Sequence, residues 1–275
     1  MNAQDVRAAA VAGHFYPAHP GKLSEMVESF LAEVDVEARP MRAVIAPHAG
    51  LVYSGQCAAH VFGRVEIPST VVILAPNHTG LVDAPRGASI WERGAFETPL
   101  GRVAVAEKFA GELELRCPLV AHDPRAHRDE HAVEVELPFL TSLAPRSAIV
   151  PIVLAWEDWP RCKQLADALA GLVSEWPEQV LLVASSDMTH FEPAARAAEK
   201  DRLALAAIER LDGEELLNAC RREQITMCGR APAAVVVEAA RQLGATRGEV
   251  VDYRHSGWVT GDDSNVVAYA GVTIA

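Results

Sequence analysis

The sequence predicts an α/β fold, a single domain over residues 1–275 in which helices flank a central mixed, largely parallel sheet. Two stretches carry this prediction, Met41 to Gly50 (MRAVIAPHAG) and Thr70 to Gly80 (TVVILAPNHTG), because each runs a short apolar strand pattern into a turn. A helical pattern lies between them, and strand, helix and strand in succession are typical of a βαβ unit. We therefore expect these two strands to form a parallel pair.

The other elements follow from the spacing of apolar residues and from turn residues. Helical spacing predicts helices over residues 24–34, 54–63 (with Ser54 as the N-cap), 131–143, 159–173, 194–210, 213–220 and 231–243. Apolar runs predict strands over 148–154, 179–185 and 265–274, and a short strand over 103–106. Pro138 interrupts its helix, so a kink or an early end is expected there. Residues 81–101 contain several Gly and Pro and are expected to be irregular, and within them residues 91–101 (WERGAFETPLG) are expected to form a loop or hairpin that could overhang a pocket.

Composition is that of a globular protein and argues against several classes of function. Half of the 275 residues are hydrophobic and 23% are charged, which allows a substantial core. A net charge of -12 without a cluster of Lys and Arg argues against general nucleic-acid binding. The five cysteines are widely spread with no C-x-x-C pair, which is typical of a reduced, cytoplasmic protein. No apolar run reaches the roughly 18 residues of a membrane span, and no signal peptide is expected.

Two histidines occupy matching places in the predicted sheet. His48 follows the first apolar strand and His78 follows the second, each beside Pro or Asn in a turn. Sites in open α/β sheets lie where strands end at their carboxyl side. A single histidine in a turn is as easily an incidental turn residue as a site residue. Two in matching contexts favour a shared pocket, and a metal ion is the commonest reason for imidazoles to converge.

Three more residues lie at comparable places. Cys228 precedes a predicted helix at a Gly turn, where a thiol has a lowered pKa that favours metal binding or nucleophilic attack. A buried, inert cysteine is the alternative. Asp187 and His190, in the segment SSDMTHF, follow another apolar strand. The carboxylate could orient the imidazole, accept its proton, or cap a helix.

His131 is a further candidate because acidic residues surround it. Glu134 lies one helical turn later, and Asp129 and Glu130 come directly before it. Acidic residues are also common at a solvated helix start, because the helix dipole favours them. The remaining histidines and cysteines lack matching partners and are interpreted as surface, loop or packing residues. The Tyr53 hydroxyl could reach the same pocket.

Seven separated segments resemble the Memo family, which includes the microbial AmmeMemoRadiSam system protein B. They cover nearly the whole chain in the same order: AVAGHFYP, APHAGLVYSGQCAAH, LAPNHTG, DEHAVEVELPFL, SSDMTHF, ITMCGRAP and DDSNVVAYAG. The resemblance implies a single Memo-like domain, similar in fold to the class III extradiol ring-cleaving dioxygenases, whose Fe(II) is held by two histidines and a carboxylate. It also implies companion proteins of the radical SAM and AMMECR types.

Carried over residue by residue, the resemblance also implies site roles. The metal ligands, matching the family's two pocket histidines and its pocket cysteine, are His48, His78 and Cys228. The catalytic candidates are Asp187 and His190, which match the polar pair lining the pocket, and His131, which is compared with the acid/base histidine of the dioxygenases. The implied cofactor is Fe(II). Cu and Zn are alternatives, because a thiolate is a softer ligand than the dioxygenase carboxylate.

Three hypotheses of function stay open, because a shared fold does not carry shared chemistry. The first, favoured for a microbial-type sequence, is a non-haem iron oxygenase-like enzyme that acts on a small molecule such as a phenol and moves protons through His131 or His190. The second is a metal-binding interaction protein without turnover. The third is a zinc-dependent hydrolase or lyase with an activated water.

Overall fold

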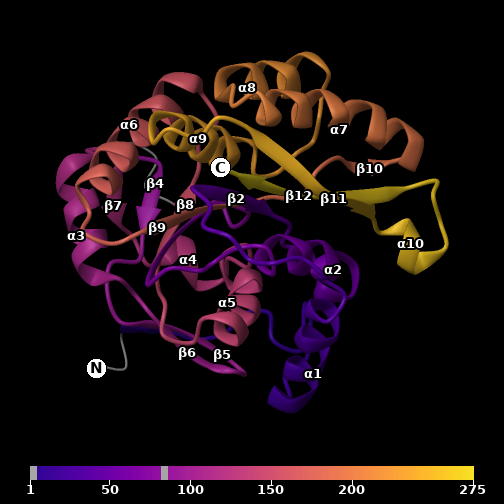
Figure 1. Cartoon of the computed structure of the whole chain (residues 1–275), viewed down its shortest axis with the longest axis horizontal. Coiled ribbons are helices and arrows are strands. Elements are labelled where there is room, and N and C mark those ends of the chain that lie inside the picture. The colour runs from indigo at the N-terminus through magenta and orange to yellow at the C-terminus, as the bar shows by residue number, and fades with distance from the viewer. Residues whose placement is uncertain (1–4, 82–85) are drawn as a thin grey trace.

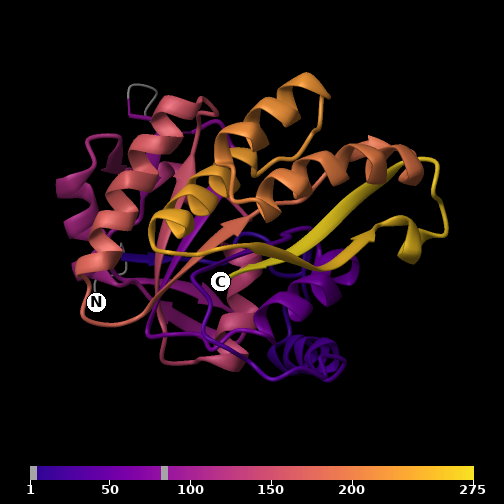
Figure 2. The ribbon, with the colours of Figure 1, turned by 45° about the horizontal axis from the view of Figure 1, so that its top comes forward.

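A nine-stranded mixed sheet runs through the centre of the molecule (Figure 1). The computed structural model describes residues 5–81 and 86–275. Along the sheet, the strands are β10 (His190–Glu192), β12 (Val266–Ile274), β2 (Ala43–Ala46), β9 (Val180–Ser185), β3 (Thr70–Pro76), β8 (Ala148–Leu154), β4 (Ala88–Ile90) and β7 (Val120–His122). β11 (Gly248–His255) pairs with β12 outside this path. Figure 2 shows the β11–β12 hairpin extending beyond the rest of the sheet, with α10 (Gly257–Thr260) at its end.

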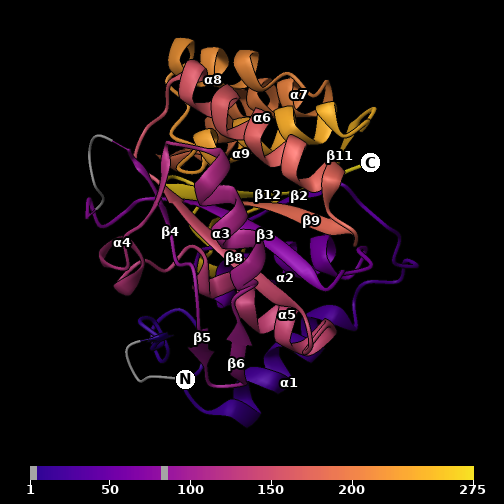
Figure 3. The same ribbon diagram turned by 90° about the vertical axis from the view of Figure 1, so that its left-hand side faces the viewer.

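Helices cover both faces of this sheet, as Figure 3 shows in a view from the side. One face carries α3 (Glu107–Arg116), α6 (Trp159–Glu175), α7 (Ala194–Glu209), α8 (Gly213–Arg222) and α9 (Arg230–Gln242). The other face carries α1 (Pro20–Leu31), α2 (Leu51–Phe62) and α5 (Leu137–Leu143). The short helices α4 (Arg125–Arg128) and η2 (Glu134–Glu136) lie in the connection before α5. A smaller sheet is formed by β1 (Val6–Arg7), β5 (Ala95–Thr98) and β6 (Gly101–Ala104).

The four strands at the centre of the large sheet are parallel. β2 and β3 each pair in parallel with β9, and β3 also pairs in parallel with β8. Every residue of β2, β3 and β9 is buried, which explains their continuous apolar sequences, because helices cover both faces. The expected direct pairing of β2 with β3 is wrong, since β9 lies between them. β12 and β4 add antiparallel neighbours, so the sheet is mixed and largely parallel at its centre, as predicted.

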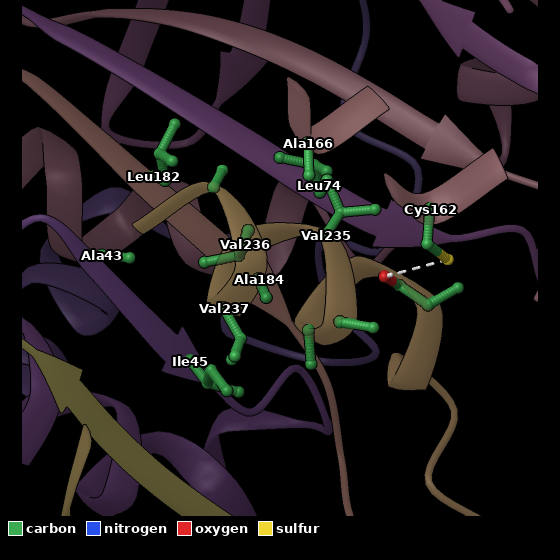
Figure 4. Close-up of a cluster of buried hydrophobic side chains, with 14 of the residues drawn as sticks. Ala43, Ile45, Leu74, Cys162, Ala166, Leu182, Ala184, Val235, Val236 and Val237 are labelled. Atoms are coloured by element: carbon green, nitrogen blue, oxygen red, sulfur yellow. Dashed lines mark hydrogen bonds between the residues drawn. The ribbon is translucent and has the colours of Figure 1, made fainter. Parts of the chain in front are cut away.

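Helix α9 is deeply buried on the upper face of the sheet in Figure 1, and it fixes one side of the site described below. All of its residues from 231 to 240 are buried, and all of them except Glu238 are apolar. Figure 4 shows Val235, Val236 and Val237 of this helix among strand side chains that include Ile45 and Ala184. Burying each valine stabilises the fold by roughly 1.5–3 kcal/mol. The start of α9 is therefore held rigidly against the sheet.

The opposite face packs α2 against α1 and α5. The rings of Phe62 in α2 and Phe139 in α5 are stacked, with centroids 5.7 Å apart. Gly55 permits the close approach of α1, because a Cβ atom there would lie 2.4 Å from the ring of Phe30. Both contacts hold α2 against the sheet, and α2 begins three residues after His48.

The N-terminal segment is tied to the sheet through Glu134. This carboxylate is completely buried and forms an ion pair with Arg7, which is also buried. It accepts hydrogen bonds from the backbone N–H groups of Ala10 and Val11 at 2.8 and 3.0 Å, and from the Tyr16 hydroxyl. Removing one partner of such a buried pair typically costs about 3–5 kcal/mol, so this cluster fixes the start of the described chain beside η2.

Several expected elements begin or end elsewhere. α2 begins at Leu51 with Gly50 as its N-cap, and Ser54 donates instead to the Ala49 carbonyl at 2.8 Å. Pro138 lies in the first turn of α5, where a missing N–H costs nothing. The helix expected from residue 131 therefore begins only at Leu137, and Pro138 does not interrupt it. The hairpin expected at 91–101 is β5–β6, which extends to Ala104, and residues 82–85 of the irregular stretch lie outside the described residues. β11 was not predicted.

Among the residues that the structure describes, no helix combines the length and the apolar character needed to cross a membrane.

Candidate metal centre

Three imidazoles meet at the carboxyl end of the parallel strands. His48 follows β2, His78 follows β3, and His131 lies between α4 and η2. One ligand nitrogen from each ring lies within 4.8 Å of the other two. An ion with bonds of about 2.1 Å holds its ligand atoms roughly 3–3.4 Å apart, so a small side-chain movement closes the three rings around one ion.

His48 is held by contacts on both its ring and its backbone. Its Nδ1 lies 2.8 Å from Oγ of Ser185, the last residue of β9. Its backbone N–H donates to Asp187 Oδ1 at 2.9 Å, and the N–H of Ala49 donates to the same oxygen at 3.3 Å. Burial, with a contribution from nearby His78, lowers the pKa of His48 to about 3. The ring is therefore neutral at pH 7 and presents Nε2 to the cluster.

The turn after β3 aims His78 at the same point. Asn77 Oδ1 accepts hydrogen bonds from the backbone N–H groups of Thr79 and Gly80 at 3.1 and 3.0 Å. Gly80 has a φ of +70°, a conformation that favours glycine, so the tight turn depends on it. The Nδ1 atom of His78 is directed at Glu130 Oε1, 2.9 Å away, which leaves Nε2 for the cluster.

Glu130 is the carboxylate that binds two of the three histidines. Its Oε2 accepts the backbone N–H of His78 at 2.6 Å, and its Oε1 accepts the backbone N–H groups of His131 and Ala132 at 2.9 and 3.0 Å. Burial alone would raise the pKa of Glu130, but the His78 hydrogen bond and charge and the other donors lower it to about 2. The sequence analysis named Glu130 only as an acidic neighbour of His131, with a solvated helix start as the alternative, and gave it no role in the site. Its place directly before His131 was the one available signal.

His131 completes the cluster. Its ring stacks on the ring of His78, with centroids 4.5 Å apart and an interplanar angle of 25°. The ring of Phe15 packs on it at 4.7 Å. Burial, followed by the repulsion of nearby His48, lowers the pKa of His131 to about 4. The sequence suggested an acid/base role for His131, and its position also makes it a candidate ligand.

Cys228 lies directly against this cluster. Its Sγ is 3.3 Å from Nε2 of His48 and accepts the backbone N–H of Asp187 at 3.2 Å. Gly229 permits the contact, because a Cβ there would lie 2.4 Å from the Ser185 carbonyl oxygen. Burial raises the pKa of the Cys228 thiol. This direction is opposite to the lowering expected from the following helix, because desolvation and the charge of Asp187 outweigh the hydrogen bonds from Asp187 and Gly229.

Asp187 and His190 lie at the edge of an adjoining cavity. Asp187 binds the backbone of the turn that carries His48, so its contact is with the main chain and not with an imidazole. The Nδ1 of His190 lies 2.9 Å from the Thr226 carbonyl oxygen, which can only accept, so Nδ1 carries the proton and Nε2 is the free acceptor.

The cavity has a volume of about 430 Å³, and His131 of the histidine cluster forms part of its wall. Its polar lining includes His131, Asp187 and His190. Its aromatic lining is Phe15, Tyr53, Phe191 and Tyr269. Tyr53, whose hydroxyl was expected to reach the pocket, is thus one of the residues that line this cavity.

Comparisons with known proteins agree with this architecture. The model of the Memo-like protein family matches residues 7–273. A MEMO1 family protein of Aquifex aeolicus is 42% identical over 268 residues, covering 97% of this chain and 98% of its own length. MEMO1 family protein MK0963 of Methanopyrus kandleri is 38% identical, with 97% and 98% covered.

A solved structure also shares the fold. The crystal structure of the uncharacterised Escherichia coli K12 protein JW3007 superposes with a TM-score of 0.59 over 86% of this chain and 100% of its own, at 16% identity. The family model and the relatives match nearly the full length of this chain, and the chain is therefore a member of the Memo family.

Proposed function

We propose that this chain is a metal-dependent, oxygenase-like enzyme that holds Fe(II) at the histidine cluster and acts on a small phenolic molecule in the adjoining cavity. The observation that carries the proposal is the convergence of three imidazoles, from His48, His78 and His131, within 4.8 Å beside that cavity. Neutral imidazole is a ligand that iron, copper and zinc all accept.

The ring nitrogens of two ligands are already assigned by their other contacts. Ser185 holds Nδ1 of His48, and Glu130 holds Nδ1 of His78, so in both rings Nε2 is the nitrogen left for an ion. Carboxylate and hydroxyl partners of this kind fix the orientation of a ligand histidine and raise its basicity. Cys228 is the additional ligand in this proposal, because its sulfur already contacts Nε2 of His48. When bound, iron supplies the redox and Lewis-acid chemistry that oxygen insertion requires.

The cavity provides the groups that bind and deprotonate a phenol. Phe15 and Tyr53 offer flat apolar surface for a ring, and aromatic pairs contribute roughly 0.5–1.5 kcal/mol beyond buried area. Nε2 of His190 can accept the phenolic proton, because Nδ1 of that ring is committed to Thr226. Asp187 keeps the His48 turn in place while the substrate binds.

A second candidate is favoured by the short contact between Cys228 and His48. Three imidazole nitrogens and one thiolate sulfur would occupy all four coordination positions of a zinc or Cu(I) ion and leave none open for a substrate. In that case the protein would bind metal without turnover, and the cavity would serve another purpose. Metal identity and oxygen consumption distinguish the two candidates.

The first experiment measures metal binding. The metal-free protein is loaded anaerobically with Fe(II), and with Zn(II) separately, and the dissociation constants are obtained by competition with a chromophoric chelator. His48→Ala and His78→Ala are expected to lower Fe(II) affinity by at least about 100-fold, since each removes a ligand. His14→Ala is the control, because His14 is exposed and outside the cluster. If His48→Ala and His78→Ala both kept the wild-type affinity for Fe(II), these histidines would not be metal ligands.

The second experiment measures turnover. The Fe(II)-loaded protein is mixed with catechol and oxygen, and oxygen uptake is followed with an electrode. Uptake that depends on catechol and is lost in His78→Ala supports the enzyme. Tight Fe(II) or Zn(II) binding with no uptake over a panel of catechols and monophenols would instead favour the metal-binding candidate.

A further inference from the structure

The hydroxyl of Ser185 lies among three polar neighbours below the candidate metal centre. Its Oγ is 2.8 Å from Nδ1 of His48, 2.7 Å from the carbonyl oxygen of Ala132, and 2.7 Å from Oε1 of Glu136. Ser185 and Glu136 are both completely buried. None of the functions described above uses Glu136.

A count of protons decides which of these groups donates. A serine hydroxyl has one proton and two lone pairs, and a carbonyl oxygen can only accept. The contact with Ala132 therefore requires the Ser185 proton, because no other hydrogen is available between those two oxygens. Both lone pairs of Ser185 then face His48 and Glu136. Each of these neighbours must supply its own proton, or the contact would join two acceptors.

The surroundings of Glu136 agree with a neutral carboxyl group. Its other oxygen, Oε2, is buried and has no hydrogen-bond partner among the described residues. Burial, with a smaller contribution from the charge of Asp187, raises the pKa of Glu136 well above its ordinary value, against the effect of the Ser185 hydrogen bond. An ionised carboxylate in this place would leave a charge without a cation, whereas a neutral acid leaves only an unpaired carbonyl oxygen.

We propose that Glu136 is a protonated positioning residue, which donates to Ser185 Oγ and, together with the Ala132 carbonyl, leaves that hydroxyl able only to accept from Nδ1–H of His48. His48 is then held in the one neutral tautomer that directs a bare Nε2 toward the metal centre and Cys228. The inference rests on the proposed function only for its consequence in metal binding. The proton positions themselves belong to the metal-free protein.

The first test detects the proton on Glu136 by infrared spectroscopy of the metal-free protein at pH 7. The wild type is expected to show the carbonyl stretch of a protonated carboxylic acid, which shifts in D2O and is lost in Glu136→Gln. Glu249→Gln, at an exposed position on β11, is the matched control and leaves that band unchanged. A spectrum in which Glu136→Gln removes only carboxylate bands would overturn the proposal.

The second test reads the tautomer of His48 from the 15N shifts of its ring in the same metal-free protein. Wild type and Glu136→Gln are both expected to carry the proton on Nδ1, because the glutamine amide can also donate to Ser185. Ser185→Ala removes the acceptor and is expected to lose the preference for Nδ1–H, and Ser185→Thr restores it. A wild-type ring protonated on Nε2 would refute the proton count.

The third test links the proton to the metal. Glu136→Gln is expected to retain Fe(II) affinity within about threefold, while Glu136→Met lowers it by about tenfold, the lower end of what a lost partner of a ligand histidine costs. Equal losses in the two variants would mean that the carboxylate itself is needed, which contradicts the proposal. If the infrared and 15N spectra of the metal-free protein are as expected but the protein binds no metal, the proposed function is wrong and the proton positions inferred here still hold. Urea midpoints verify that each variant is folded.

Discussion

The carboxylate of Glu130 lies 2.9 Å from Nδ1 of His78 and at the same time accepts the backbone N–H of His131 at 2.9 Å. One buried side chain thus sets both the ring orientation of the first histidine and the main-chain position of the second. The two imidazoles stack at 4.5 Å as a result. The geometry of the candidate centre therefore depends on a residue that does not itself belong to the histidine cluster.

Replacing Glu130 with Gln is expected to weaken metal binding by about 10–100-fold, because an amide cannot accept from all of these donors and carries no charge. The pKa of His78, which Glu130 raises against the opposing effect of burial, is expected to fall in the same variant. Chelator competition and an NMR titration of His78 measure the two effects. Asp129→Asn, at the exposed neighbouring acid, is the matched control. Unchanged affinity in Glu130→Gln would show that the carboxylate does not support the centre.

Replacing Cys228 with Ser is expected to change metal preference more than metal capacity. A thiolate favours Zn and Cu(I) more than Fe(II), so the affinity for Zn should fall by a larger factor than the affinity for Fe(II). Competition titrations with both ions give the ratio. Cys220→Ser, the same substitution at a buried position in α8, should leave the ratio unchanged. Equal losses for both ions would contradict this preference, and no loss for either ion would show that the sulfur is not a ligand.

The buried ring of His127 is expected to make stability depend on pH. Burial lowers its pKa to about 3, whereas the unfolded chain titrates near 6.5. Below pH 6.5 the unfolded state binds the extra proton, so the stability that this residue contributes is present above pH 6.5 and is lost toward pH 3. The loss is roughly 1.4 kcal/mol per pH unit. Other groups titrate in the same range, and a variant is needed to isolate this effect.

His127→Gln supplies that comparison. Urea denaturation at pH 7, 6 and 5 should show a free energy of unfolding that falls less steeply with acidity in the variant than in the wild type. Because slopes are compared, a uniform loss of stability in the variant does not affect the result. If the free energies of unfolding of the two proteins changed with pH at the same rate, the pKa of His127 would be the same in the folded and unfolded states.

Phe191 combines backbone strain with a place in the cavity wall. Its φ is +60°, its side chain is 75% exposed, and it lies where the β10–β12 register shifts. Phe191→Asn is expected to raise the free energy of unfolding by about 1 kcal/mol, because asparagine tolerates this conformation better. The same variant should bind a phenol several-fold more weakly, measured by calorimetry. Phe191→Tyr keeps the ring and the strain and should change neither quantity. Unaltered phenol binding in Phe191→Asn would exclude a role in the pocket.

The sequence predicted those parts of the fold that local patterns encode. The buried strands β2, β3, β8 and β9 are apolar on both faces, and the polar residues that follow β2, β3 and β9 lie together at one edge, as expected. Strand order was predicted less well, because β9 inserts between β2 and β3 through contacts far apart in the chain. β11 was missed because most of its residues are only half-buried, which leaves no clear apolar alternation.

The sequence likewise predicted some residues of the candidate site and missed others. His48 and His78 could be found because each follows an apolar strand. His131 could not be grouped with them from spacing, since it lies in a connection whose path is set by Glu130 and Glu134. Glu136 looked like one more polar residue beside an apolar run, and its burial depends on the packing of η2 against β9. Local patterns thus identified residues that end strands, but not the buried groups that orient them.

The ion pair of Arg7 with Glu134 joins positions that are 127 residues apart. A ribosome adding about 5–20 residues per second needs roughly 6–25 s to extend the chain from the first to the second. During that interval the segment carrying Phe15 has emerged without the anchor that later buries it, and Cys228 emerges later still. The Cys228 side of the pocket therefore forms only after residue 228 has left the ribosome, later than the ion pair that anchors the Phe15 segment.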